Sequence, residues 1–579
     1  MPTGTWNPGA RVLFAGVMAV GLAIVLQASS AAQGNRGAEL SGLATVSGTV
    51  TAPQPFQAAK VYFRNTDKHV VYMVYTVGGR YQAMHLFPGT YEFRVQANGL
   101  ESDVQKLIVR AGQSATANAT LHPVSTASPD NVTFLPYDEL YPAGAGRVVA
   151  EKTCIRCHGV NFLPSRQWSA AQWSAAIDMM AGTRQMPEGT QIQPEDMSPQ
   201  EREILERYLV DHFGPNSKPR ALKVEIEMPV DETKLGKALF IEYRFAPDPP
   251  GTGIHDPKYA NLPRTGFSGR RVSQDVHFDK EGNVWVIDRG IPNRLAKLDP
   301  RTAQYKNFDF PEPANDNHDI LIDRNGIIWA PDDGMWINVF NPQTEKFETR
   351  YALDPDNVVK ANLKHPQSMA MDSFHNIYVG LILGGALSKW NRETKKVSVY
   401  PLPTPNAYPY GVVSDSRDNI WIAEFHGSKI AKFDPKTEKF TEYAPPTSPA
   451  LIRRLKVDGD DNVWFGLFSA GKLVKLETST GKMTEYKIPH QISQPYDVAP
   501  VGDDAVWISD AGQGGALIRF DRKTETFTYF PTPQRSDMPK IHVTRDGAVW
   551  YPPRSTREGP GAGVLYPDMT KITTLAAYF

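Results

Sequence analysis

The sequence has very little cysteine and no excess of charge of either sign. Its 579 residues include two cysteines, both in one short motif, so no framework of disulfide bonds supports the fold. Lys and Arg total 62, against 63 Asp and Glu. A chain without a basic excess lacks the electrostatic footprint of nucleic-acid binding, so we expect no nucleic acid among its partners. The hydrophobic share of 41% and the charged share of 22% are typical of a globular protein.

Long hydrophobic runs are also scarce, and the one that stands out lies at the N-terminus. Arg11 precedes an apolar stretch over Val12–Leu26, and small residues follow up to Ala32. One positive charge, a core too short to span a membrane and small residues for cleavage predict a secretory signal peptide over residues 1–32. The alternative is an uncleaved N-terminal anchor. Both interpretations export the protein, so we expect a periplasmic or secreted protein with no transmembrane domain after signal removal.

From about residue 235 to residue 579 the sequence repeats with a nearly constant period. An apolar stretch centred on an aromatic residue recurs with spacings of 44, 49, 43, 43, 43 and 43 residues. These anchors are Trp285, Trp329, Tyr378, Trp421, Trp464, Trp507 and Trp550. Four short strands in a repeat of about 43 residues is the period of a β-propeller blade. The region 235–579 is therefore predicted to be a seven-bladed β-propeller.

Residues 39–122 alternate in the manner of short β-strands, separated by Gly, Pro and Asn turns. The predicted strands are Thr45–Thr51, Lys60–Arg64, Val70–Thr76, Thr90–Val95 and Lys106–Arg110. Their pattern favours a small antiparallel β-sandwich. The segments SGTVTA, AAKVYF and GRYQAMHLFPGTYEFRVQANG resemble the carboxypeptidase regulatory-like family, which has a prealbumin-like fold. This resemblance implies a fold and no chemistry.

The chain changes character between the sandwich and the repeats. Residues 123–145 are rich in Pro, Ser and Ala and predict a linker. Residues 146–215 predict a small all-α domain. Ser169 can cap a helix that runs to about Met180, and the capping box Ser198-Pro-Gln-Glu201 opens a second helix. The predicted fold class is thus multidomain and mainly β, with one all-α domain.

The motif Cys154-Ile-Arg-Cys157-His158 predicts covalent attachment of one haem c. Two thiols three residues apart on a helical turn reach the two vinyl groups of one porphyrin, and the adjacent His158 becomes the proximal iron ligand. A redox dithiol and half of a zinc site are the alternatives. The first lacks a thioredoxin-like βαβ setting, and the second lacks two further ligands. Covalent attachment takes place outside the cytoplasm, which agrees with export and indicates a bacterial source.

A methionine on the far side of the iron would complete the ligand set. The segments CIRCH, SAAQWSAAIDMM and SPQEREILERYLVDHFGP together resemble the single-haem cytochrome c domains attached to dehydrogenases. This resemblance implies Met180 as the distal ligand. The general cytochrome pattern instead favours Met186, which precedes a proline. We expect Met180, with Met186 as the alternative, and Met179 and Met197 as other methionines of the segment.

The repeat over residues 409–446 resembles the streptogramin B lyase (virginiamycin B lyase) family of seven-bladed propellers. The resemblance implies histidines at the starts of the last blades, a glutamate after the anchor strand, and a divalent cation. The corresponding starts here are Pro409-Tyr-Gly, Pro495-Tyr-Asp and Pro539-Lys-Ile, without histidine. Glu424 matches the glutamate, and Glu424 and His426 are the remaining catalytic candidates. We therefore do not expect lyase activity.

The starts of the innermost strands and the ends of the anchor strands meet at one mouth of a propeller. By register this mouth gathers Gln274, Asp288, Arg289, His318, Asp332, Asp333, His365, Tyr410, Glu424, His426, Arg453, Arg454, Asp497, Asp510, Lys540 and Arg554. The set suits a polar or anionic ligand, or a cation. The first hypothesis is an exported c-type cytochrome whose propeller binds a small molecule or a redox partner, with a dehydrogenase role left open. The alternatives are a metal-dependent lyase and a non-catalytic surface binding protein.

Overall fold

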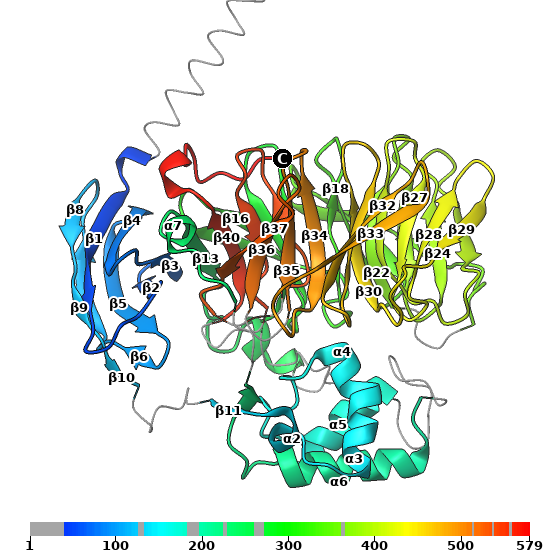
Figure 1. Cartoon of the computed structure of the whole chain (residues 1–579). Coiled ribbons are helices and arrows are strands. Elements are labelled where there is room, and N and C mark those ends of the chain that lie inside the picture. Colours follow the sequence, from blue (N-terminus) through cyan, green and yellow to red (C-terminus); the bar gives the residue numbers. More distant parts are fainter. Residues whose placement is uncertain are drawn as a thin grey trace, which may run out of the picture.

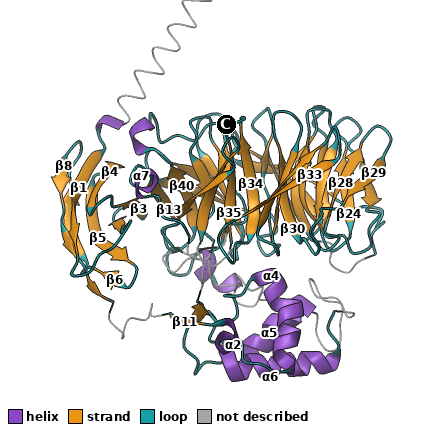
Figure 2. Ribbon diagram, in the orientation of Figure 1, coloured by secondary structure: helices purple, strands orange, loops and turns teal. Residues whose placement is uncertain are grey.

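The computed structural model describes residues 40–124, 132–181, 196–223, 228–259, 271–360, 365–511, 515–534, 536, 538–554 and 559–579. It has an N-terminal β-sandwich, a ring of β-sheets, and a helical module against one face of the ring (Figure 1, Figure 2). The predicted signal peptide lies outside these residues. No helix in the described ranges is both long and apolar enough to cross a membrane. The chain is mainly β and multidomain, as predicted.

The N-terminal sandwich has two sheets. One contains β1 (Ala44–Thr51), β4 (Arg80–Leu86), β8 (Ser114–Thr116) and β9 (Ala119–Thr120). The other contains β2 (Lys60–Asn65), β3 (Val70–Tyr75), β5 (Gly89–Ala97), β6 (Leu100–Glu101), β7 (Gln105–Val109) and β10 (His122–Pro123). Alternate residues of both sheets face inward, and aromatic rings fill the core. Phe63, for example, lies 5.2 Å from Phe93 and 5.9 Å from Tyr81 between ring centroids.

Six blades of the propeller are four-stranded antiparallel sheets with sequential strand order. Blades 1 to 3 are β14 (Ser273–Phe278), β15 (Val284–Asp288), β16 (Arg294–Asp299), β17 (Gln304–Asp309); β18 (Leu321–Ile322), β19 (Ile328–Asp332), β20 (Trp336–Asn341), β21 (Lys346–Ala352); and β22 (Pro366–Met371), β23 (Ile377–Leu381), β24 (Ala386–Trp390), β25 (Val397–Pro401). Blades 4 to 6 are β26 (Pro409–Ser414), β27 (Ile420–Glu424), β28 (Lys429–Asp434), β29 (Lys439–Tyr443); β30 (Ile452–Val457), β31 (Val463–Leu467), β32 (Lys472–Glu477), β33 (Lys482–Lys487); and β34 (Pro495–Val501), β35 (Ala505–Asp510), β36 (Ala516–Asp521), β37 (Thr526–Pro531).

The seventh blade combines strands from the two ends of the repeat region. Its inner strands are β38 (His542–Val543), β39 (Val549–Tyr551) and β40 (Gly561–Tyr566), and its outer strand is β13 (Leu239–Arg244). Strand β13 also pairs antiparallel with β3, with Phe240 opposite Met73. The sandwich sheet and the last blade therefore form one continuous sheet, which closes the ring and attaches the sandwich to it.

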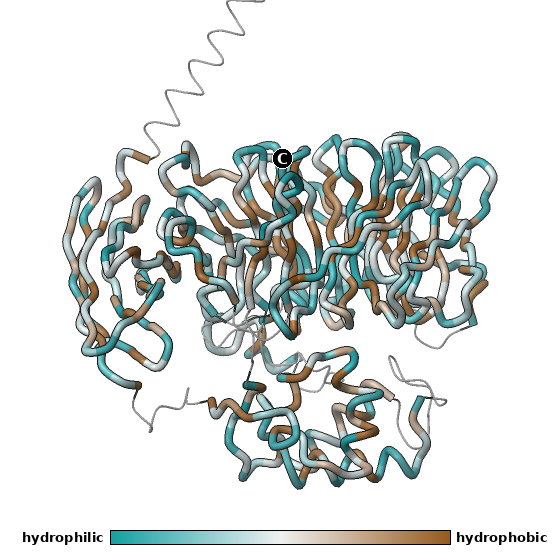
Figure 3. Tube along the Cα trace, viewed as in Figure 1, coloured by the Kyte–Doolittle hydropathy of each residue, from teal (hydrophilic) through white to brown (hydrophobic). Residues whose placement is uncertain are grey.

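The anchors are buried between neighbouring blades, and an aspartate six residues earlier fixes most of them. Trp464 lies in a core cluster with Val498 and Ile508 of the next blade. In the first five blades the aspartate accepts a hydrogen bond from the anchor; the donors are Trp285, Trp329, Tyr378, Trp421 and Trp464. Along the tube in Figure 3, hydrophobic segments lie within the blades and the loops of the upper face are mostly hydrophilic. In these five blades a hydrogen bond thus joins the turn before the anchor strand to the buried anchor.

The helical module contains α2 (Tyr137–Leu140), α3 (Ala145–Ala150), η2 (Glu151–Ile155), α4 (Arg156–His158), α5 (Ala170–Ala181) and α6 (Pro199–Phe213). Helix α5 matches the helix expected after Ser169. Helix α6 begins with the expected capping box, in which Ser198 and Glu201 each accept from the other's backbone. Trp173 and Ile177 of α5 pack on Leu205 and Leu209 of α6.

The segment expected as a linker, residues 123–145, is partly structured. It contains α2 and β11 (Thr133–Leu135), which pairs in parallel with β12 (Arg220–Leu222) beyond α6. Leu140 is fully buried in the core of the helical module, so apolar side chains among the Pro and Ser residues hold this stretch in place. Short elements complete the chain: α7 (Glu232–Leu235), η3 (Gly253–His255), η4 (Pro257–Tyr259) and η5 (Met569–Lys571).

Replacing Asp458 with alanine is expected to destabilise the propeller by about 2–3 kcal/mol. Its carboxylate accepts hydrogen bonds from Trp464 Nε1 at 2.9 Å and from the Asn462 backbone at 2.9 Å, so the change leaves buried donors without acceptors. Urea denaturation of the two proteins measures the difference. Asp504→Ala is the control, because the Asp504 side chain forms an exposed ion pair with Lys523. Equal stability losses in the two variants would contradict the proposed role of the aspartate.

Candidate functional site at the propeller mouth

Two positions in each repeat line the face of the ring nearest the helical module. The residues eleven before each anchor are Gln274, His318, Gln367, Tyr410, Arg453, Tyr496 and Pro539. Those four after each anchor are Arg289, Asp333, Ile382, Phe425, Phe468, Ala511 and Arg554. We call this opening the mouth. Because every blade repeats the same backbone, the side chains at these positions decide its chemistry.

One half of the mouth is aromatic. Tyr410, Phe425, Phe468 and Tyr496 form a buried cluster contributed by blades 4, 5 and 6. The Arg453 guanidinium lies among them, 4.3 Å from the Phe468 ring centroid and 4.4 Å from that of Tyr496. It donates a hydrogen bond to the Tyr410 hydroxyl at 3.0 Å, and that hydroxyl is hydrogen-bonded to Tyr496. Four aromatic faces thus stabilise one half-buried cation.

The helical module contacts this aromatic half through its cysteine motif. Arg453 donates a hydrogen bond to the Cys157 carbonyl oxygen at 2.7 Å, and the Cys157 side chain packs on the aromatic cluster. Gly159 has φ +80°, and a β-carbon there would lie 2.1 Å from Gln494 Oε1 of blade 6. The absence of a side chain therefore permits close approach of the motif to the ring. In Figure 1, α4 is the helix of the module that lies nearest the propeller.

The two cysteines are free thiols, and each is partly buried. Burial raises the pKa of the Cys154 thiol to about 11 and also raises that of Cys157, so both are protonated at neutral pH. The π-helical turn η2 carries Cys154, and α4 carries Cys157 and His158. The His158 imidazole stacks on the Phe162 ring, with centroids 4.2 Å apart.

His158 is neutral in these surroundings. Desolvation, with the nearby Arg453, Arg166 and Arg554 charges, lowers its pKa to about 3. Ile155, Val160, Phe162 and Trp168 supply apolar surface beside Cys154. Two free thiols, a neutral imidazole and an apolar wall are the groups that a covalently attached haem requires, so the residues present fit that cofactor.

The methionines of the module occupy different environments. Met180 is half-buried near the end of α5, and its neighbour Met179 is 42% exposed. Met197 belongs to the module core, packed with Leu205 and Trp173. Met186 lies outside the described residues. Met180 therefore stays the prediction for a distal ligand, with Met186 as its alternative.

The other half of the mouth is polar and comes from blades 1, 2 and 3. Arg289 donates to Asp316 through Nε at 2.6 Å and to Gln274 at 3.0 Å. The His365 Nδ1 atom lies 2.7 Å from Asp333 Oδ1, and the His365 ring lies 4.3 Å from that of His318 between centroids. This side of the mouth, opposite the aromatic cluster, thus holds two imidazoles, two carboxylates and one guanidinium.

Several residues predicted at the mouth lie deeper or point elsewhere. Lys540 is buried and pairs with Asp275 at 2.6 Å and with Asp319. Asp288 is held by Arg271 at 2.6 Å, and Asp510 accepts from Ser493 at 2.8 Å. The two catalytic candidates also separate. Glu424 is fully buried against Glu442, and burial with that charge raises the pKa of Glu424 to about 8.

His426 lies at the contact with the helical module. Its ring stacks on Tyr408 at a centroid distance of 4.0 Å. Desolvation and the Arg156 charge lower its pKa to about 4, partly offset by Asp196. Both charged neighbours belong to the helical module. His426 therefore contributes to docking, whereas Glu424 lies within blade 4.

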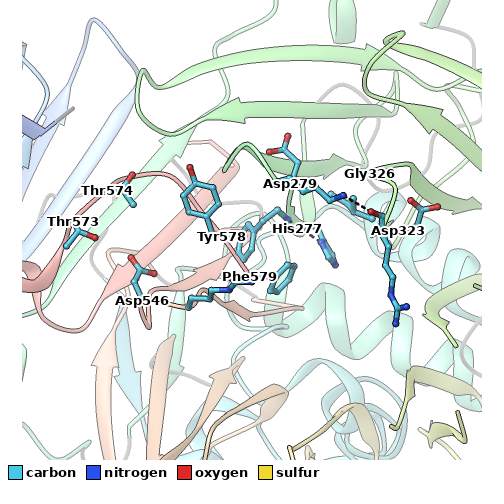
Figure 4. Close-up of a pocket in the computed structure, with 14 residues that line it drawn as sticks. His277, Asp279, Asp323, Gly326, Asp546, Thr573, Thr574, Tyr578 and Phe579 are labelled. Atoms are coloured by element: carbon cyan, nitrogen blue, oxygen red, sulfur yellow. Dashed lines mark hydrogen bonds between the residues drawn. The ribbon is translucent and has the colours of Figure 1, made fainter. Parts of the chain in front are cut away.

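A second hollow lies on the opposite face of the ring, near the C-terminus. Its volume is about 760 Å³, and its walls include His277, Asp279, Asp323 and Tyr578 (Figure 4). Phe579 packs on the His277 ring with centroids 4.9 Å apart, so the chain's own end fills part of this hollow. None of the residues predicted to carry function lies here, and the mouth remains the candidate site.

Comparison with known proteins supports two of the three expected family resemblances. Residues 358–558 match the Virginiamycin B lyase family, and residues 45–122 match the Carboxypeptidase regulatory-like domain. No curated protein matches the chain.

Among solved structures, a streptogramin B lyase is similar at 21% identity and a TM-score of 0.45, with 51% of this chain and 93% of that chain covered. The virginiamycin B lyase of Staphylococcus aureus shows 19% identity and a TM-score of 0.45, covering 51% and 94%. The U3-55K structure shows 9% identity and a TM-score of 0.42, covering 51% and 95%. None of these likenesses transfers an activity to the chain.

Sequence reasoning missed the aromatic side of the site. Phe425, Phe468 and Tyr496 contact Arg453 and Cys157, and the predicted set of mouth residues did not include them. Gln494 was also missed as the neighbour of Gly159. The fixed offsets from the anchors carried this information, because they place the same repeat positions of all seven blades at the mouth. What the sequence could not show is which half of the mouth receives the helical module.

Arg453→Ala is expected to loosen the docking of the helical module. The change removes the donor to the Cys157 carbonyl and the cation held by the aromatic rings, at a cost of about 2–3 kcal/mol. Hydrogen exchange should therefore become faster in the amides of Cys154 to Gly159, while the blade cores stay protected. Arg350→Ala is the matched control, because Arg350 lies over Trp336 at 4.5 Å but on the outside of the ring. Unchanged exchange in Arg453→Ala would contradict this docking contact.

Proposed function

We propose that this chain is an exported c-type cytochrome joined to a β-propeller that binds a ligand or a redox partner, and that it acts in electron transfer outside the cytoplasm. The observation that carries the proposal is the position of the cysteine motif, which Arg453 holds against the mouth of the propeller. A cofactor on this motif would lie at the boundary of the two parts. The N-terminal signal predicted over residues 1–32 supports export.

Four residues would hold the cofactor. Cys154 and Cys157 would form the thioether bonds, and His158 together with Met180, or Met186 in its place, would be the iron ligands. The bound haem would supply one-electron redox chemistry. The low pKa of His158 keeps its imidazole neutral, as an iron ligand must be. Phe162 stacks on that imidazole and sets its orientation.

The mouth residues define where a partner could approach. The aromatic cluster and Arg453 cover the Cys157 side of the motif. The polar half, with Arg289, His318 and Arg554 near one another, is the part suited to a charged or hydrogen-bonding ligand. A single haem passes single electrons, so a two-electron substrate would require a further cofactor or partner. We therefore propose electron transfer and leave the dehydrogenase role as an extension of it.

Expression with haem-maturation machinery is expected to give a red protein with sharp c-type α and β bands on reduction. Cys154→Ser and Cys157→Ser should each weaken covalent attachment, and their combination should abolish it, because no other thiol exists in the chain. His158→Ala should lose the low-spin spectrum. Absorption spectra and the mass of the purified chain check these outcomes. A colourless wild-type protein with two free thiols would contradict the proposal and favour a non-catalytic binding protein.

The distal ligand can be tested with two adjacent methionines of α5. Met180→Ala is expected to remove the weak long-wavelength band of methionine-ligated ferric haem and to lower the reduction potential. Met179→Ala is the matched control, because Met179 is more exposed on the same helix, and its spectrum should stay unchanged. If Met180→Ala keeps the band and Met186→Ala loses it, the ligand is Met186.

A further inference from the structure

Three metal-binding side chains converge in the polar half of the mouth. His318 and Asp333 come from blade 2 and His365 from blade 3, and one ligand atom of each lies within 4.8 Å of the others. No other such group of three occurs among the described residues. The set is separate from the cysteine motif, and the electron-transfer proposal does not use it.

The repeat backbone places all three side chains at the mouth. His318 lies eleven residues before Trp329, and Asp333 lies four residues after it. His365 has φ +48°, a left-handed conformation that Tyr408 and Leu451 share at the same position of the next two blades. The conformation is therefore a feature of the repeat and not a strain peculiar to this site. The three ligands lie at the ends of strands: Asp333 directly follows β19, His365 directly precedes β22, and His318 lies three residues before β18.

The state of the side chains suits metal binding. His318 is 4% exposed, and its buried Nδ1 atom has no hydrogen-bond partner among the described residues. Its ring lies nearly perpendicular to that of His365, at 79°, so the two imidazoles approach edge to face. The side chains of His365 and Asp333 are 13% and 22% exposed, so the set is reached from the mouth. A buried imidazole nitrogen without a partner calls for a ligand.

The charges around the set are mixed. Arg289, which acts on both His318 and His365, is already paired with Asp316. Arg554 and Arg454 add positive charge beside His318, and Asp333 and Asp316 add negative charge beside His365. An ion bound there would replace the contact between His365 Nδ1 and Asp333 Oδ1 and would meet two imidazoles and one carboxylate.

We propose that His318, Asp333 and His365 bind a divalent first-row transition-metal ion of the Zn²⁺ or Fe²⁺ kind. Two imidazoles and a carboxylate are preferred by such ions, whereas Mg²⁺ and Ca²⁺ prefer oxygen ligands alone. Three protein ligands leave coordination positions open for water or for an oxygen-bearing ligand that enters through the mouth.

Two of the three ligands lie outside the segment that matches a known family. His318 and Asp333 precede residue 358, where the match to the Virginiamycin B lyase family begins. Arg554 acts electrostatically on both His318 and His158, so the ion and the cysteine motif share one mouth. A ligand coordinated by the ion would therefore lie in the space that the motif borders.

Metal binding is tested on the full-length, haem-loaded protein after treatment with a chelator. Titration with Zn²⁺ in a calorimeter, followed by elemental analysis, should show one ion per chain. His318→Gln, His365→Gln and the isosteric Asp333→Asn should each weaken binding by about 100-fold or more, because each removes a direct ligand. His277→Gln is the control, because His277 lines the hollow on the opposite face and its loss should leave the affinity unchanged.

Two results would overturn the metal site. One is the absence of Zn²⁺ binding by the wild-type protein, or binding that all three substitutions leave intact. The other is stoichiometric binding of Mg²⁺ without Zn²⁺. Circular dichroism of each variant shows whether it is folded, and Asp333→Asn provides the test if a histidine variant is not. The haem spectrum of the same samples reports on the electron-transfer proposal separately, so failure of one is distinguishable from failure of the other.

Discussion

Each of the first five blades depends on an aspartate that accepts a hydrogen bond from its own aromatic anchor. The bond joins the turn before the strand to the core between two blades, and it fixes how far each strand runs toward either face of the ring. Because the register is set in this way, the residues eleven before and four after an anchor always reach the mouth. The side chains at these positions can then differ from blade to blade without changing the blades, since they contact one another and the helical module at the mouth.

The mouth of this propeller has two halves of different chemistry. Blades 4 to 6 supply aromatic rings, which hold one arginine and receive the cysteine motif. Blades 1 to 3 supply charged and imidazole groups. One half of the mouth is apolar and packs on the helical module, and the other half is polar. One ring has both halves because its blades differ at the positions that face the mouth. The helical module therefore covers one side of the mouth and leaves the other reachable.

Much of this architecture could be predicted from the sequence. The anchor spacing predicts the propeller, the alternation over residues 39–122 predicts the sandwich, and Ser198 with Glu201 predicts the start of α6, because each is a local pattern with a fixed period or cap. The pairing of β13 with β3 could not be predicted, since neither strand carries a signal for a partner so far away. The mouth was predicted as one set of residues, but Glu424 lies buried in its blade, and Phe468, which the predicted set did not include, lies at the mouth. Only the three-dimensional packing shows which of these side chains face the mouth.

The closure of the ring by β13 has a consequence for the order of folding. Strand β13 leaves the translation machinery more than 300 residues before β40, its partner in the last blade. An unpaired strand edge is prone to misassociation during such an interval. Strand β3 is made before β13 and can pair with one of its edges at once. The other edge of β13 then pairs with β40 of the last blade. The N-terminal sandwich can therefore cover one edge of β13 before the last blade is made.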